Sequence, residues 1–260
     1  MKSQIKVLLI LVIVFSALFI YAQSPYGMTF AKQLLKKIDI DLSEPEKEEV
    51  NMLAEVEETL EPDTTAQHFL FVGDSMVEPL AYRFYDYCRE NGDTMYAVTW
   101  YGSTTTAWSG ETMDYYIDKV KPTFIIYCMG SNELTSKNIK AINANLARMQ
   151  AKANGVPCIF IGPPNTTPDT GLNDEIAKVF GKRAFFDSRN IEMERRSDKL
   201  HPTNAGARIW MDEICTWLNS QECVHPVVLN VPLEERPYSI EHIEVMKVKD
   251  KGRRLNKPSV

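Results

Sequence analysis

The sequence predicts an α/β fold, a three-layer α/β/α sandwich built around a five-stranded parallel sheet. Two observations lead to this prediction. Short, continuously apolar runs alternate with helical patterns from residue 68 onward, as expected for parallel strands that helices cover on both faces. Four of the runs end at a glycine, so their turns should meet at one edge of the sheet: Gly73, Gly102, Gly130 and Gly162. A chain of 260 residues that is 44% hydrophobic can bury one such core.

The expected elements follow one another regularly between residues 67 and 220, which we take as the bounds of the domain. The strand-like runs are residues 68–72, 95–101, 124–129, 158–161 and 184–187. Helical patterns cover residues 77–91, 111–120, 137–154 and 172–180. A last helix is predicted after Pro202, with an apolar face of Ile209, Trp210, Ile214, Trp217 and Leu218.

Residues 1–22 have the pattern of a signal peptide or membrane anchor. Lys2 and Lys6 precede an uncharged apolar run over residues 7–22. Cleavage after Ala22 would put Ile20 at the −3 position, where small residues are usual, so we favour an anchor that is retained. Both alternatives predict an exported protein, periplasmic or otherwise extracytoplasmic, and the anchor would tether it to the membrane.

The segments that flank the predicted domain differ from it in composition. Residues 23–66 are rich in Asp and Glu from residue 39 onward and are expected to form an acidic juxtamembrane spacer. Residues 221–260 contain four prolines and show little periodicity, which predicts an irregular C-terminal extension.

Charge and cysteine content argue against several classes of ligand. A net charge of −6 makes nucleic acid an unexpected partner. The five cysteines form no CxxC pair and give no disulfide framework, although a Cys215–Cys223 disulfide stays open. We therefore expect no metal and no cofactor, and we expect a monomer.

Four short blocks carry the residue types needed for nucleophilic catalysis. Gly73-Asp74-Ser75 follows the first strand, which is where a serine can be presented at a strand-to-helix turn. Asp198 and His201 stand three residues apart before the last helix and could supply an acid and a base. Gly102 follows the second strand and Asn132 follows the third, so both could donate hydrogen bonds to a developing oxyanion. Taken singly, Asp74 and Asn132 are also ordinary turn residues.

These blocks, in this order, resemble the SGNH hydrolase family, also called GDSL esterases and lipases. Other motifs are absent: Val77 replaces the last glycine of a G-x-S-x-G elbow, and no phosphate-binding glycine loop occurs. The resemblance covers about residues 66–219 and departs from the usual pattern at Glu133, where the family often has aspartate. It implies a flavodoxin-like fold, agreeing with the pattern of strands and helices.

The resemblance also implies a role for each residue of the blocks. Ser75 would be the nucleophile, His201 its base, and Asp198 the acid that orients His201. The oxyanion hole would consist of the backbone N–H groups of Ser75 and Gly102 and the side-chain amide of Asn132. An acyl-serine intermediate follows from these roles.

The acceptor of the acyl group stays open at this point. Hydrolysis would make the protein an esterase acting on an acylated small molecule or glycan, most simply an O-acetyl ester on a carbohydrate. Transfer would make it an O-acetyltransferase of an envelope polysaccharide, paired with a membrane-bound acyltransferase. A catalytically silent glycan-binding module is the third alternative, and the intact set of Ser75, Asn132, Asp198 and His201 argues against it.

Overall fold

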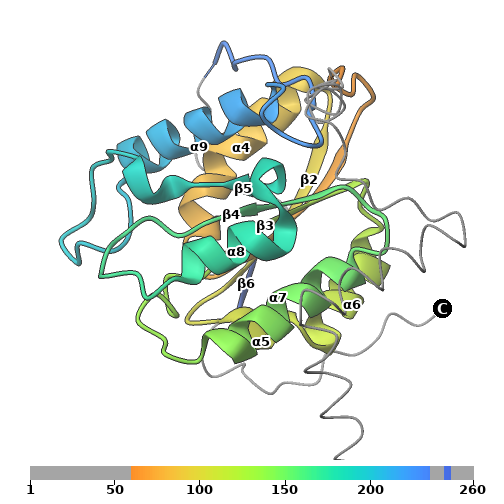
Figure 1. The fold of residues 1–260 in the computed structure, drawn as a ribbon. Coiled ribbons are helices and arrows are strands. Elements are labelled where there is room, and N and C mark those ends of the chain that lie inside the picture. Colours follow the sequence, from red (N-terminus) through yellow and green to blue (C-terminus); the bar gives the residue numbers. More distant parts are fainter. Residues whose placement is uncertain (1–59, 235–242, 247–260) are drawn as a thin grey trace, which may run out of the picture. The chain divides into compact units, whose positions relative to one another are not determined.

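The computed structural model describes residues 60–234 and 243–246. Within these residues one six-stranded sheet has the order β5-β4-β3-β1-β2-β6, and every pair of neighbouring strands is parallel (Figure 1). The strands are β1 (His68–Gly73), β2 (Thr94–Trp100), β3 (Phe124–Cys128), β4 (Cys158–Ile161), β5 (Phe185–Phe186) and β6 (Ile243–Met246). The predicted fold class, an α/β fold with a parallel sheet, is therefore confirmed.

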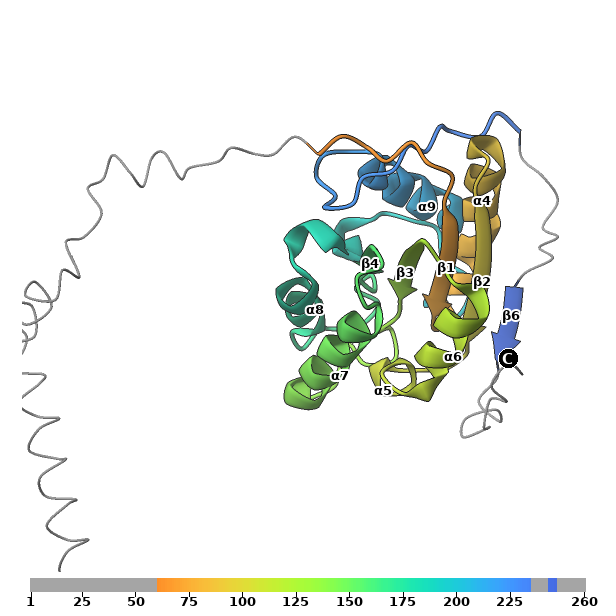
Figure 2. The ribbon, with the colours of Figure 1, turned by 90° about the vertical axis from the view of Figure 1, so that its right-hand side faces the viewer.

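Helices cover both faces of the sheet and complete three layers. One face carries α4 (Val77–Asn91) and α9 (Asn204–Leu218), which lie side by side in both views (Figures 1 and 2). The other face carries α5 (Thr105–Trp108), α6 (Glu111–Val120), α7 (Ile139–Lys152) and α8 (Leu172–Phe180). Two 3₁₀ turns, η1 (Lys182–Ala184) and η2 (Ser188–Asn190), flank β5.

Each layer of helices buries its own apolar core against the sheet. Phe69 and Phe71 on β1 point to the α4–α9 side, where they meet Phe84 and Trp210. The alternate residues of the same strand, Leu70 and Val72, belong to the cluster on the other face. The unbroken apolar run of residues 69–72 is thus explained by a sheet buried on both sides.

The structure corrects the sheet at one point. We predicted five strands, and β6 adds a sixth at the edge of the sheet beside β2 (Figure 2). It comes from the segment 221–260, which we expected to be irregular. Glu244 on β6 binds Lys119 of α6 at 3.2 Å, and Tyr96 of β2 donates a hydrogen bond to the same carboxylate at 3.0 Å. These partners lie far away in the sequence, so the local pattern gave no sign of the strand.

Two further predictions depend on the ends of the chain and on the cysteines. The expected signal or anchor at 1–22 and nearly all of the acidic spacer lie outside the described residues. Within the described parts, none of the helices combines the length and the apolar character that crossing a bilayer requires. All five cysteines are free thiols, so the Cys215–Cys223 disulfide is not formed.

The strand order determines where a ligand can bind. β1 lies between β3 and β2. The chain therefore runs from β1 to β2 on one side and then crosses back to β3 on the other side of β1. In such a sheet, the loops after these two strands separate and leave a crevice at the carboxyl edge. The first three motif blocks lie in the loops after β1, β2 and β3.

Candidate active site

Three of the predicted residues form a continuous chain of hydrogen bonds. Ser75 Oγ lies 2.8 Å from His201 Nε2, and His201 Nδ1 lies 2.8 Å from Asp198 Oδ2. The hydrogen bond from His201 is the largest of the contacts that lower the pKa of Asp198 to about 2, so this carboxylate only accepts hydrogen bonds. His201 must then carry a hydrogen on Nδ1, which leaves Nε2 of the neutral ring to accept the hydroxyl hydrogen of Ser75.

The loop before α9 holds the acid and the base in this geometry. Asp198 Oδ1 accepts hydrogen bonds from the backbone N–H groups of Leu200 and His201, both at 2.9 Å. Lys199, which follows Asp198, has a φ of 58°, the left-handed conformation that such a tight turn requires. Arg196 closes the loop, because its backbone N–H donates to the oxygen of His201 at 2.8 Å. The spacing of three residues between Asp198 and His201 is therefore the spacing of one closed turn.

Ser75 is positioned by the turn that joins β1 to α4. Gly73 ends β1 so close to β3 that a Cβ atom there would lie 1.7 Å from the backbone oxygen of Cys128. Only glycine allows this approach. The backbone N–H of Asp74 donates to that same oxygen at 3.1 Å, and α4 begins two residues after Ser75. The half-buried serine therefore stands at the carboxyl edge of the sheet, as the motif predicted.

The predicted oxyanion donors come from the two neighbouring loops. Gly102 follows β2 with a φ of 67°, a left-handed conformation that favours glycine. The side-chain amide of Asn132 donates to the backbone oxygen of Ser103 at 2.9 Å, so the structure places Asn132 against the Gly102–Ser103 turn. The two loops that carry these donors therefore meet beside the Ser75 turn, since Ser103 Oγ also donates to the oxygen of Gly73 at 3.4 Å.

Glu133 has a role that the sequence did not reveal. Its carboxylate is buried and accepts the backbone N–H of Thr105 at 2.7 Å and the Thr105 hydroxyl at 2.9 Å. Burial raises the pKa of Glu133, and these two hydrogen bonds lower it. Thr105 begins α5 two residues after Ser103, so Glu133 ties the loop after β3 to the loop after β2.

Asp74 is the second residue that makes contacts the sequence did not predict. We interpreted it as a turn residue, and one of its oxygens does accept the Met76 N–H at 3.0 Å. The other oxygen accepts the N–H groups of Gly130 and Ser131 at 3.1 and 3.2 Å. A hydrogen bond between positions 56 residues apart leaves no local pattern in the sequence.

The two tryptophans nearest Gly102 offer no stacking surface for a sugar. Trp108 is fully buried and Trp100 almost so, and the two rings pack edge to face with centroids 6.0 Å apart. Their role is in the core. Tyr101 is half-buried, and its hydroxyl donates to Glu78 in the first turn of α4.

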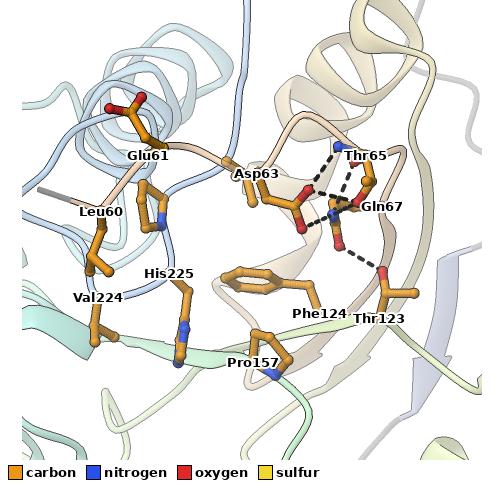
Figure 3. Close-up of a pocket in the computed structure, with 12 residues that line it drawn as sticks. Leu60, Glu61, Asp63, Thr65, Gln67, Thr123, Phe124, Pro157, Val224 and His225 are labelled. Atoms are coloured by element: carbon orange, nitrogen blue, oxygen red, sulfur yellow. Dashed lines mark hydrogen bonds between the residues drawn. The ribbon is translucent and has the colours of Figure 1, made fainter.

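A separate hollow of about 320 Å³ lies at the opposite, amino-terminal edge of the sheet (Figure 3). Gln67 and Thr123, which precede β1 and β3, hydrogen bond to each other there, and His225 packs edge to face on Phe124. None of the predicted site residues lines this hollow. Across the described part of the chain, no group of three or more His, Cys, Asp or Glu side chains could hold a metal ion.

Neither a family model nor a curated protein matches the chain. Several solved structures are similar to it. The esterase EstA from Pseudoalteromonas sp. is 19% identical, with a TM-score of 0.48 over 59% of this chain and 99% of that one. A protein of the G-D-S-L family from Desulfitobacterium hafniense is 13% identical, with a TM-score of 0.44 over 58% and 98%.

A two-domain esterase active on acetylated mannans is 14% identical, with a TM-score of 0.46. The match covers 65% of this chain and 53% of the esterase, about half its length. Identities and TM-scores this low assign neither an activity nor a substrate, which have to be inferred from the residues of the site.

Proposed function

We propose that this protein is a serine esterase that hydrolyses an O-acyl ester through an acyl-Ser75 intermediate. The observation that carries the proposal is the hydrogen-bonded chain from Ser75 through His201 to Asp198, with both links at 2.8 Å. Such a chain activates a hydroxyl that is otherwise a weak nucleophile.

The proposed reaction has two steps with the same residues in each. Ser75 Oγ attacks the ester carbonyl while His201 Nε2 takes its proton, and Asp198 stabilises the imidazolium that forms. The N–H groups of Ser75 and Gly102 and the amide of Asn132 stabilise the oxyanion. The leaving alcohol receives the proton from His201, and water then attacks the acyl-serine by the same route in reverse.

The polarity of the surroundings favours a short acyl group, an acetyl, on a carbohydrate. In the described part of the chain, the large hydrophobic side chains that are exposed are Ile209, Val231, Leu233 and Val245. None of them lies in the four loops that carry the site. Asn132 and Asp198 are exposed and His201 is half-exposed, so the site opens to solvent and suits a hydroxyl-rich carrier better than a long alkyl chain.

The first experiment tests the nucleophile. Purified protein should hydrolyse p-nitrophenyl acetate, and Ser75→Ala should lower kcat by about three orders of magnitude or more. A fluorophosphonate probe should label Ser75 in the wild type. Ser220→Ala, at the far end of α9, is the matched control and should retain full activity. Activity retained in Ser75→Ala, or labelling of another residue, contradicts the proposal.

The second experiment separates hydrolysis from transfer, because both reactions use every residue named above. An acetyl donor is supplied with and without oligosaccharide acceptors, and free acetate and acetylated sugar are measured together. Release of acetate from an acetylated xylan or envelope polymer supports the esterase. Acetylated sugar in excess of free acetate would instead make the protein an O-acetyltransferase, and a membrane-bound acyltransferase would then be its expected partner.

We also propose that residues 1–22 place this esterase outside the cytoplasm and tether it to the membrane. The uncharged run over residues 7–22 after Lys2 and Lys6 supports export. Full-length protein should fractionate with membranes and retain its N-terminal segment by mass. A soluble exported form that starts near Gln23 would show that the segment is a removed signal peptide.

A further inference from the structure

Asp74 is a fully buried carboxyl group beside the nucleophile. Its side chain joins two segments: Oδ1 accepts the N–H of Met76 at 3.0 Å, and Oδ2 accepts those of Gly130 and Ser131 at 3.1 and 3.2 Å. Met76 is the residue after Ser75, and Ser131 is the residue before Asn132. The same carboxyl group therefore holds the chain next to the proposed nucleophile and next to the proposed oxyanion donor.

Keeping an ionisable group at this position is costly. Burial raises the pKa of Asp74 to about 6, even though the three backbone N–H groups and the nearby His201 favour its ionised form. The other titratable group that faces it is the buried thiol of Cys128 at the end of β3, whose pKa burial holds well above its ordinary value. A turn alone needs only the contact with Met76, which an asparagine could make without burying a charge.

The backbone of Asp74 is held in place by hydrogen bonds as well, so its side chain projects from a rigid main chain. The backbone N–H of Asp74 donates to the backbone oxygen of Cys128 at 3.1 Å, and the backbone oxygen of Asp74 accepts a hydrogen bond from the hydroxyl of Thr99 at 2.7 Å. Contacts to β2 and β3 thus anchor the main chain while the side chain reaches the loop after β3.

We propose that Asp74 is a positioning residue, whose carboxylate sets the distance between the nucleophile Ser75 and the oxyanion donor Asn132. This inference rests on the proposed esterase function. Moving a donor away from a developing oxyanion raises the barrier of the chemical step and leaves substrate binding almost unchanged. Asp74 touches no reacting atom and acts only through the two segments that it joins.

Asp74→Asn is the variant that tests this. An amide cannot accept at its nitrogen, so either the Met76 contact or the Gly130–Ser131 contacts are lost. We expect kcat for p-nitrophenyl acetate to fall by about 30-fold or more, with KM within about threefold. Asp74→Ser, which also lacks the bridging carboxylate, should show the same split and serves if the asparagine variant does not fold.

A double-mutant cycle with Asn132→Ala distinguishes positioning from a general loosening of the fold. If Asp74 acts by placing Asn132, Asp74→Asn should cost less than about threefold in kcat once Asn132 is absent. Equal costs in both backgrounds overturn the inference, as does a wild-type kcat in Asp74→Asn.

The matched control is Asp93→Asn. Asp93 is a half-buried aspartate at the opposite edge of the sheet that accepts the backbone N–H of Gln67 at 2.7 Å. The Asp93→Asn substitution should leave kcat unchanged. Failure of the proposed function has a different signature: the wild type itself would then neither hydrolyse the ester nor be labelled at Ser75.

Discussion

The side-chain amide of Asn132 donates a hydrogen bond to the backbone oxygen of Ser103 at 2.9 Å. Only the amide nitrogen can donate to a carbonyl, so this contact fixes which end of the amide faces the loop after β2. The same nitrogen carries a second hydrogen, which is the one that the proposed mechanism assigns to the oxyanion.

Asn132→Ala should therefore act on the chemical step. We expect kcat to fall by about 100-fold while KM changes far less, because the donor is needed chiefly in the transition state. Asn132→Asp, which keeps the size but puts an anion beside the oxyanion, should be at least as harmful. Steady-state kinetics decide, and a rise in KM with kcat unchanged would make Asn132 a contact of the bound substrate instead.

Asp198→Asn tests the orienting acid. The pKa of Asp198 is lowered to about 2, so its carboxylate stays ionised throughout the pH range of an ordinary assay. Asparagine can still accept the N–H of Leu200, but its amide favours the wrong tautomer of His201, and kcat should fall by about 100-fold or more.

The acid limb of the wild-type pH–rate profile should not reflect the titration of Asp198. Its folded pKa is depressed, so its contribution to stability is present above about pH 4 and is lost only as the pH falls towards 2. An apparent pKa near 4 in kcat/KM that disappears in Asp198→Asn would contradict this.

Glu133 should be needed for its length more than for its charge. A glutamine at this position could still accept the N–H of Thr105 and donate to its hydroxyl, so Glu133→Gln should cost less than about 1 kcal/mol of unfolding free energy. Glu133→Ala leaves both Thr105 groups without that partner and should cost about 1–3 kcal/mol, with a lower kcat because the Gly102–Ser103 turn is released. Denaturant unfolding and kinetics measure the two effects, and equal behaviour of both variants would refute this role.

Gly73→Ala should be among the most destabilising substitutions in the domain. The added methyl group would lie 1.7 Å from the oxygen of Cys128, in backbone that cannot move without separating β1 from β3. We expect a loss of about 3 kcal/mol or more in the free energy of unfolding. Gly110→Ala, where a Cβ meets nothing within 4 Å, is the control and should cost less than about 1 kcal/mol. A similar melting temperature for both variants would contradict the predicted clash.

The stability of Asp74→Asn relative to the wild type should depend on pH. Because the folded pKa of Asp74, about 6, lies above the ordinary value of 3.8, the folded wild type holds this proton more tightly than the unfolded chain does. Its contribution is present below about pH 4 and is lost as the pH rises through 6, by up to about 3 kcal/mol. In denaturant unfolding, the free energy of unfolding of Asp74→Asn should therefore rise relative to that of the wild type by up to that amount between about pH 4 and pH 7. A constant difference would show that the pKa of Asp74 is not raised.

The sequence predicted those parts of the fold that depend on local pattern. The run at 68–72 is apolar after His68 and became β1 with one more residue, and α4 has the expected bounds of Val77–Asn91. The four residues of α5 are too few to show a helical period. The strand β6 depends on partners more than a hundred residues away, and Glu244 within it is not typical of a buried strand.

The candidate site divides in the same way. Ser75, Asp198 and His201 were predicted from their residue types, from the turn after β1 and the spacing of three residues, and from the resemblance to the SGNH hydrolases. Asp74 and Glu133 were not assigned their roles, since both act on the backbone of a loop that only the folded sheet brings near. Side-chain bonds to distant N–H groups follow from which loops meet in space, and no spacing in the sequence encodes them.

β6 determines how far the chain can be shortened from its C-terminal end. A stop codon before residue 243 would keep every residue of the proposed site and still remove the strand that pairs with Ala97–Trp100 of β2. The unpaired N–H and C=O groups of β2 would then be open to other strands, a recognised route to aggregation. Expression of a fragment that ends just before Ile243 is thus expected to fail by precipitation, whereas a fragment that runs through Met246 should stay in solution.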